Sequence, residues 1–386
     1  MSIARIVPTL AVFIAGLLYA QEIQLPKNPL RGQIVFEEKE CIQCHAIGGY
    51  GGSDGPDLSQ NLYFGSVLEL ASIVWNHTPQ MNRKFRQLRM DRPRLTQDEM
   101  LDLLGFLYYL RYLGEPGSVA RGKKLLESKG CITCHTVAGK GGTVGPNFEH
   151  VQQYDSPLYL VQAMWNHGSA MHEEIRKSEL KFPELSGQDI SDIAAYIRQA
   201  TVGGTVIRMS PGDPTKGKEI FSAKRCNNCH LVEGKAKRIG PNLSKIELRK
   251  GVTEVASLMW NHGPVMLEAM KQESIEWPRF GDNEMADLIA YLYFLGFEDK
   301  PGDKNKGEHV FKVKGCGGCH VKGGAGKAPD LASIKRFDSP VRMIQLMWNH
   351  ASEMEDLLIA QNRELPELST ADMRDLYAYL KAVTPK

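Results

Sequence analysis

The chain lacks any strong excess of charge of one sign. Its 386 residues contain 47 Lys and Arg against 45 Asp and Glu, which gives a formal net charge of +2. No basic tract is interleaved with aromatic residues in the manner of a base-stacking groove. We therefore expect no nucleic-acid partner and only a weak long-range electrostatic field.

Long hydrophobic runs are also lacking, with one exception near the N-terminus. Arg5 is followed by an apolar run over residues 6–20, and polar Gln21 comes directly after it. The pattern predicts a secretory signal peptide at residues 1–20, because the run is too short for a comfortable membrane span. An uncleaved anchor and a buried helix are the alternatives. After a lead at 21–30, we expect an exported protein, periplasmic or on the extracytoplasmic face of a membrane, and soluble or peripheral.

No stretch alternates between apolar and polar residues for long, as a half-buried strand would. Helical signals recur instead. A glycine is followed four residues later by a large apolar residue, as in Gly32 and Phe36, and a later segment opens with a capping box, as in Thr96 and Glu99. We expect an all-α fold in which the first and last helices of each unit cross at the glycine.

No cysteine lies outside one short motif. All eight belong to four Cys-x-x-Cys-His elements, formed by Cys41, Cys44 and His45; Cys131, Cys134 and His135; Cys226, Cys229 and His230; and Cys316, Cys319 and His320. Disulfides, a redox dithiol and half a zinc site are the other uses of such pairs. The histidine directly after the second cysteine favours covalent haem attachment in all four copies. We expect four haem c groups, with these histidines as the proximal iron ligands.

A second motif, Trp-Asn-His-x-x-x-Met, recurs at a fixed distance behind each cysteine motif. Its copies contain Trp75, His77 and Met81; Trp165, His167 and Met171; Trp260, His262 and Met266; and Trp348, His350 and Met354. A proline always lies 19 residues before the tryptophan, at Pro56, Pro146, Pro241 and Pro329. The chain is thus one unit of roughly 90 residues repeated four times. The expected domains are 31–113, 118–200, 215–296 and 303–386, with a linker at 201–214, and neighbouring domains should pack together.

The second motif offers two candidates for the distal iron ligand, because imidazole and thioether both bind haem iron. If the helix continued, the histidine and the methionine would share a face and compete for the iron. Pro79, Gly168 and the Gly263-Pro264 pair predict that the helix ends after the histidine in units one to three, so that the methionine arrives from a loop. Unit four has no such break. We expect the tryptophan to pack on the haem edge. The earlier proline is interpreted either as a carbonyl acceptor for the proximal histidine or as a simple turn residue.

Each unit resembles a class I cytochrome c domain. The resemblance rests on the glycine-x-x-x-aromatic helix, Cys-x-x-Cys-His, the Gly-Pro-x-Leu loop and the last helix, as at residues 183–197 and 366–380, and it covers almost all of residues 31–386. It implies Met81, Met171, Met266 and Met354 as distal ligands, and a proline carbonyl that accepts from the proximal histidine. The histidine four residues before each methionine departs from the family pattern, so His77, His167, His262 and His350 stay open as ligands.

Four six-coordinate irons would leave no open position for a substrate, and the sequence holds no other catalytic constellation. We therefore expect a multihaem electron carrier and not an enzyme. Its partners would be redox proteins or a membrane respiratory complex, with membrane-surface association left open and no small-molecule substrate. A polymerising conduit or filament subunit, and a peroxidase or reductase with one exchangeable site, are the alternatives. Residues 83–94, with six cationic side chains and one acidic one, are either a solvated face or a docking rim for an acidic partner.

Overall fold

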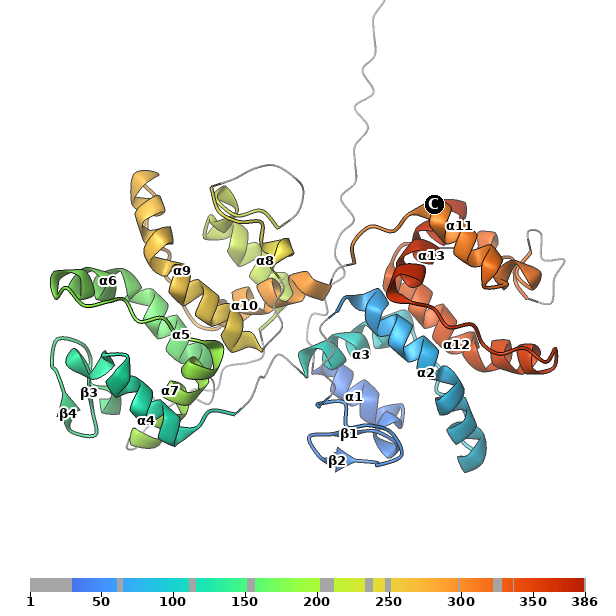
Figure 1. Cartoon of the computed structure of the whole chain (residues 1–386), viewed down its shortest axis with the longest axis horizontal. Coiled ribbons are helices and arrows are strands. Elements are labelled where there is room, and N and C mark those ends of the chain that lie inside the picture. Colours follow the sequence, from blue (N-terminus) through green and yellow to red (C-terminus); the bar gives the residue numbers. More distant parts are fainter. Residues whose placement is uncertain are drawn as a thin grey trace, which may run out of the picture.

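The computed structural model describes residues 30–60, 65–110, 116–150, 157–201, 212–232, 239–246, 251–297, 299–321, 328–335 and 337–384. The expected signal peptide, nearly all of the lead and residues 202–211 of the expected linker lie outside the described residues. The described part is mostly helical (Figure 1). Its strands form two short antiparallel hairpins, which the sequence analysis did not anticipate.

Units one and two share one order of elements, except that unit two adds a 3-10 turn and divides the helix that is continuous in unit one. Unit one consists of α1 (Arg31–Glu38), the 3-10 turn η1 (Cys41–Gln43), β1 (Ala46–Ile47), β2 (Tyr50–Gly51), α2 (Val67–Leu88) and α3 (Gln97–Tyr109). Unit two consists of α4 (Val119–Ser128), η2 (Cys131–Thr133), β3 (Thr136–Val137), β4 (Lys140–Gly141), η3 (Phe148–His150), α5 (Pro157–Asn166), α6 (Gly168–Lys177) and α7 (Gly187–Ala200).

Units three and four repeat this order, without a hairpin in their described residues. Unit three consists of α8 (Pro214–Ala223), η4 (Cys226–Asn228), η5 (Leu243–Lys245), α9 (Val252–Gln272), α10 (Glu284–Phe294) and η6 (Leu295–Phe297). Unit four consists of α11 (Lys304–Val313), η7 (Cys316–Gly318), η9 (Leu331–Ser333), α12 (Pro340–Ile359) and α13 (Thr370–Val383). The repeat seen in the sequence is thus a repeat of structure.

The first and last helices of each unit cross at the expected glycine. A Cβ atom added to Gly307 of α11 would lie 1.9 Å from the carbonyl oxygen of Asp375 in α13, and the other three units show the same overlap at 2.0 Å. Next to the crossing, the rings of Phe311 and Tyr379 lie 5.5 Å apart. Only glycine allows this approach, because the opposing atom is backbone and has little freedom to move.

We expect Gly307→Ala to lower the stability of unit four. Overpacking of this kind costs about 1–3 kcal/mol, and the roughly 1 kcal/mol of helix propensity that alanine gains offsets only part of it. Denaturant unfolding followed by haem absorbance would measure the change. Gly318→Ala is the matched control, because a Cβ there meets nothing within 4 Å and the other units carry Gln43, Thr133 and Asn228 at this place. Equal midpoints for the two variants would contradict the crossing argument.

Capping boxes begin the last helices of three units, as the sequence predicts. The Thr96 hydroxyl accepts from the Glu99 backbone N–H while the Glu99 carboxylate accepts from the Thr96 N–H, and units two and four repeat this exchange. In unit three the Glu284 carboxylate accepts from the Gly281 N–H at 2.9 Å. These local bonds fix where each last helix starts, and hence where the helices cross.

The units associate in two pairs that do not follow chain order. Figure 1 shows unit one, in blue, beside unit four, in orange and red, while units two and three form the other half. Helix α2 contacts α12 and α13, and α9 contacts α5 and α7. The expectation that chain neighbours pack together therefore holds for units two and three, whereas unit one packs chiefly on unit four.

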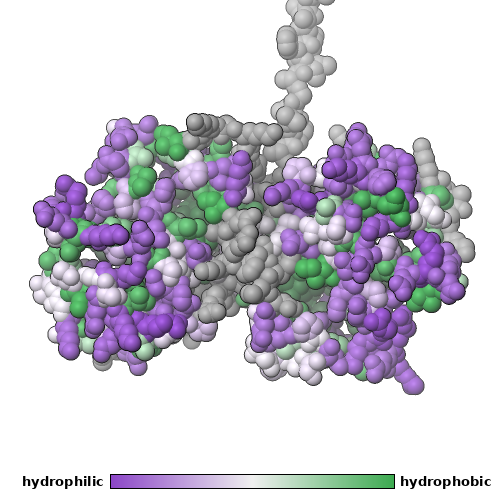
Figure 2. Space-filling view, viewed as in Figure 1, coloured by the Kyte–Doolittle hydropathy of each residue, from purple (hydrophilic) through white to green (hydrophobic). Residues whose placement is uncertain are grey.

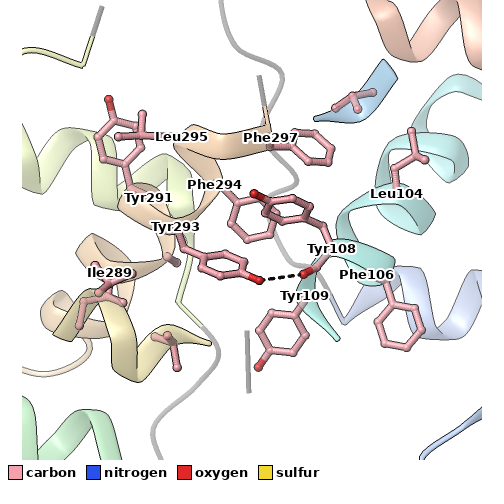
Figure 3. Close-up of a cluster of buried hydrophobic side chains, with 14 of the residues drawn as sticks. Leu104, Phe106, Tyr108, Tyr109, Ile289, Tyr291, Tyr293, Phe294, Leu295 and Phe297 are labelled. Carbon is pink, nitrogen blue, oxygen red and sulfur yellow. Dashed lines mark hydrogen bonds between the residues drawn. The ribbon is translucent and has the colours of Figure 1, made fainter. Parts of the chain in front are cut away.

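The two halves meet at an aromatic cluster. The Tyr108 ring of unit one lies 5.2 Å from Tyr293, 5.2 Å from Phe294 and 5.3 Å from Phe297 of unit three. Figure 3 shows the Tyr293 hydroxyl donating to the backbone carbonyl of Tyr108, at 3.3 Å. Elsewhere, the face seen in Figure 2 is mostly hydrophilic, with hydrophobic side chains scattered in small groups among its coloured residues.

A partly buried carboxylate, Asp299, ties the connector between units three and four to the start of α2. It accepts hydrogen bonds from the Ser66 hydroxyl and, at 3.0 Å, from the Leu68 backbone N–H. Burial raises its pKa to about 6, and these hydrogen bonds only partly oppose the rise. Its ionised form is therefore less favourable in the folded chain than in the unfolded one.

This raised pKa predicts a pH-dependent stability. Below about pH 4 the carboxyl of Asp299 is protonated in both the folded and the unfolded state. Between about pH 4 and 6 it ionises in the unfolded chain but not yet in the folded one, so the free energy of unfolding falls as the pH rises. Above about pH 6 the free energy of unfolding no longer changes with this group. Thermal unfolding of wild type and Asp299→Asn across this range should show the variant gaining relative stability with pH. The control is Asp303→Asn, since hydrogen bonds from the N–H groups of Lys306 and Asn305 lower the pKa of Asp303. A constant difference between wild type and Asp299→Asn would refute the prediction.

Candidate haem-binding sites

Each Cys-x-x-Cys-His motif forms one tight turn at the end of the unit's first helix. In unit one the turn follows Glu40, which has a φ of 61°, and the His45 N–H donates to the Cys41 carbonyl at 3.0 Å. The same N–H to carbonyl bond closes the turn in the other units. Both thiols and the imidazole thus come from one short rigid segment, which suits simultaneous attachment and ligation.

The eight cysteines, all within the described residues, are free. Burial raises the pKa of Cys41, Cys131 and Cys226 to about 11. Thiols of this kind are protonated at neutral pH and are poor nucleophiles, because the thiolate is the reactive form. The raised pKa of these three thiols therefore gives no support to a redox dithiol.

The proximal histidines are held by the loop prolines. Nδ1 of each histidine lies at hydrogen-bond distance from a proline carbonyl oxygen: His45 to Pro56 at 3.1 Å, His135 to Pro146 at 2.9 Å, His230 to Pro241 at 3.2 Å, and His320 to Pro329 at 2.9 Å. A carbonyl on Nδ1 fixes the tautomer in which Nε2 carries the lone pair. Nε2 is therefore the atom presented to a metal.

The glycine before the proline brings the loop against the imidazole. A Cβ on Gly55 would lie 2.4 Å from the His45 ring, and Gly145 and Gly240 are placed in the same way at 2.4 and 2.6 Å. Unit four has Ala328 at this position, in a loop two residues shorter. The close contact explains why three units carry glycine and why the fourth needs a different loop.

The predicted helix breaks after the distal histidine are wrong in units one and three. Helix α2 runs from Val67 through Pro79 to Leu88, and α9 runs from Val252 through Pro264 to Gln272. Unit two does break, since α5 ends at Asn166 and α6 begins at Gly168. Packing of α2 and α9 against the paired unit outweighs the cost of an internal proline. Histidine and methionine consequently share one helix face, one turn apart.

In units one and three the histidine of the Trp-Asn-His motif lies close to the histidine of the Cys-x-x-Cys-His motif. The ring centroids of His45 and His77 lie 6.3 Å apart, and those of His230 and His262 lie 6.4 Å apart. Burial lowers the pKa of His77, and the neighbouring His45 lowers it further, so the neutral ligating form of His77 is favoured.

Unit four shows the haem-sized space most clearly. A cavity of about 370 Å³ is lined mainly by apolar side chains and also by Cys316, Cys319, His320, His350 and Met354. Two thiols on one wall, an imidazole held through Nδ1 and an apolar interior fit a covalently attached, iron-containing macrocycle. Cysteine thioethers would anchor the group, and His320 would supply the proximal ligand.

Comparison with known families agrees with this geometry. The sequence model of the family described as Cytochrome c matches residues 30–111, 119–201 and 214–295. The chain belongs to the cytochrome c family. The comparison with solved structures found no match. Unit four lies outside the matched residues, yet it has the same order of helices, the same Cys-x-x-Cys-His turn and the same proline-to-histidine bond.

Membership makes the chain a multihaem c-type cytochrome, with covalent haem c implied at its Cys-x-x-Cys pairs. Proteins of this family are typically electron carriers, and c-type cytochromes are extracytoplasmic. Among the described residues, no helix combines the length and the apolar character needed to cross a bilayer.

The tryptophans of this cytochrome reach across to the paired unit, a contact that the sequence analysis did not anticipate. Each indole N–H donates at 2.7–2.8 Å to a proline carbonyl: Trp75 to Pro366, Trp348 to Pro93, Trp165 to Pro278, and Trp260 to Pro183. Trp75 also lines the unit-four cavity. The tryptophan of unit one therefore lies at the candidate haem site of its partner unit.

The asparagine after each tryptophan adds two further bonds. The Asn76 side chain donates to the Leu368 carbonyl and accepts from the Leu368 N–H, both at 2.9 Å. Asn349 forms the same pair with Leu95, Asn166 with Phe280, and Asn261 with Leu185. We call each tryptophan–asparagine pair with its proline loop a clasp. The sequence shows that the tryptophan and the asparagine recur in every unit. It does not show which other unit they contact.

Three of the six cationic residues in the basic segment at 83–94 contact unit four, whereas Arg83 and Arg89 are exposed. Arg86 pairs with Asp356 at 3.3 Å and Arg94 with Glu353 at 3.2 Å. The guanidinium of Arg92 lies 3.8 Å from the centre of the Trp348 ring, and burial lowers its pKa to about 10. Neither the solvated-face nor the docking-rim interpretation anticipated an acidic counterpart within the same chain.

Proposed function

We propose that the chain carries four covalently bound haems, one in each unit, and transfers electrons between redox partners outside the cytoplasm. Four complete Cys-x-x-Cys-His turns support this number, each with its histidine held on a proline carbonyl. Family membership supports the carrier role. Export through a signal peptide at residues 1–20 belongs to the same proposal.

We further propose that the haems work as two pairs, one in units one and four and the other in units two and three. The observation that carries this is Trp75, which belongs to unit one but lines the cavity of unit four while bonding to Pro366. The reciprocal clasp places Trp348 against Pro93 of unit one. The Trp75 clasp thereby holds α2 of unit one against the candidate haem site of unit four, and electron transfer is faster over shorter gaps.

The partners we propose are redox proteins or a membrane respiratory complex, because a carrier needs a donor and an acceptor and no small-molecule substrate. Two features recur in every unit, a candidate proximal histidine and two candidate distal ligands, and they favour a saturated iron over an open one. A subunit of a polymerising cytochrome filament is the alternative role, with the same four haems. No contact within the described residues specifically favours it.

Haem count and carbon monoxide binding together test the proposed function. The intact mass of the exported protein should exceed the peptide mass by four haem masses. The fully reduced protein should bind no carbon monoxide, because every iron of a carrier already has six ligands. A small-protein electron acceptor should then reoxidise all four haems. Binding of carbon monoxide near one equivalent per chain, with peroxide turnover, would instead establish the haem-enzyme alternative. Fewer than four haems after full maturation would overturn the four-haem proposal.

A further inference from the structure

Each Trp-Asn-His-x-x-x-Met motif contains two candidates for the sixth iron ligand. The histidine and the methionine of each second motif are four residues apart, so both lie on the same face of a continuous helix in units one, three and four. Resemblance to class I cytochromes c implies the methionine. The geometry within this chain favours the histidine.

The separation of the imidazoles is the first observation. Two metal–nitrogen bonds of about 2 Å, one on each side of an iron, leave the centroids of two opposed imidazole rings roughly 6 Å apart. The observed separations are 6.3 Å for His45 and His77 and 6.4 Å for His230 and His262. In units one and three, His77 and His262 thus stand where an axial ligand opposite the first histidine would stand.

The second observation is a carbonyl contact on the distal imidazole itself. His350 Nδ1 lies 2.8 Å from the Leu346 carbonyl oxygen, one helical turn earlier. His167 has the same kind of bond with the Ala163 carbonyl. Such a contact selects the tautomer that leaves Nε2 free to bind metal. Proximal His320, whose Nδ1 is held by Pro329, is oriented by the same device.

We propose that His77, His167, His262 and His350 are the distal ligands, so that each haem iron has two imidazoles. The inference rests on the proposed function, because it presupposes a haem in each unit. Met171, Met266 and Met354 pack against the hydrophobic core beside the site. Met354 lines the same cavity as His350 and so forms part of the pocket wall in unit four.

A consequence is a lower potential than the class I pattern implies. A methionine ligand raises the potential of a haem with one histidine ligand. With two imidazoles, each unit should have a lower potential than a His/Met haem in an otherwise equal pocket. The chain would then suit transfer at the low-potential end of an electron-transfer sequence.

Unit two provides a discriminating experiment on the holoprotein. In Met171→Leu, the ferric electron paramagnetic resonance spectrum should keep all its bis-imidazole low-spin signals, and the reduced protein should still bind no carbon monoxide. Adding His167→Ala to this variant should remove one such signal and open one iron per chain to carbon monoxide. His172→Ala is the control, because His172 is a histidine nearby that is not a candidate ligand.

Loss of a low-spin signal or binding of carbon monoxide in Met171→Leu alone would overturn the ligand assignment. So would a wild-type ferric spectrum with the weak red absorption band of an iron–methionine bond. The single variant and the wild-type spectrum stay informative even if the double variant does not fold. If the haem count is four and the wild type excludes carbon monoxide, the carrier role survives a failure of this assignment.

Discussion

A variant with Cys131→Ser and Cys134→Ser should carry three haems in place of four. The two thiols lie on one short turn of unit two, and each other unit has its own turn, proline carbonyl and histidine. Because attachment is local, the mass should fall by one haem while the spectra of units one and four stay unchanged. Intact-mass measurement and haem absorbance per chain would establish the result.

The equivalent change in unit three, Cys226→Ser with Cys229→Ser, is the matched comparison. It should also remove one haem, and the two variants should lose it from the same half of the molecule. Loss of two or more haems in either variant would show that attachment in one unit depends on another. The independence of the four sites would then be wrong.

Breaking the clasp between units two and three should destabilise that half of the molecule and spare the other. Asn166→Ala with Asn261→Ala removes four hydrogen bonds of 2.7–2.9 Å to the backbone of Phe280 and Leu185. At roughly 1 kcal/mol net for each bond, the loss would be about 4 kcal/mol. Unfolding followed by the circular dichroism of the haem bands should show one transition moving to lower temperature and the other staying in place.

Asn147→Ala is the control for this variant, because the bonds of the Asn147 side chain within the described part of the chain stay inside unit two, at Glu149. Asn76→Ala with Asn349→Ala should produce the mirror result, lowering the transition of units one and four. If the double variant of units two and three and the Asn147 control had the same two midpoints, the clasp would not be what holds the pair together.

The parts of the fold that depend on local chemistry are predictable from the sequence. The helix starts at Thr96, Ser186 and Ser369 follow from capping boxes, and the crossing at Gly307 follows from a glycine four residues before an aromatic. Each signal is contained in a few adjacent residues or recurs four times.

Features that depend on contacts between distant segments could not be predicted in this way. Pro79 and Pro264 predict helix ends, but tertiary packing keeps α2 and α9 continuous. Trp75 is expected on the haem edge of its own unit, yet its partner is Pro366, 291 residues away. All four units carry the same Trp-Asn-His motif, so nothing in the motif itself says which unit pairs with which.

The pairing is nested: units two and three close on each other inside the longer loop that joins units one and four. During synthesis, units two and three can associate as soon as both have emerged. Trp75 and Asn76 of unit one can form their hydrogen bonds only after the loop at residues 366–368 has been made. Unit one therefore leaves its docking face uncovered until nearly the whole chain is available. Docking of the outer pair is therefore completed last, so this half is the more exposed to proteolysis or wrong association during maturation.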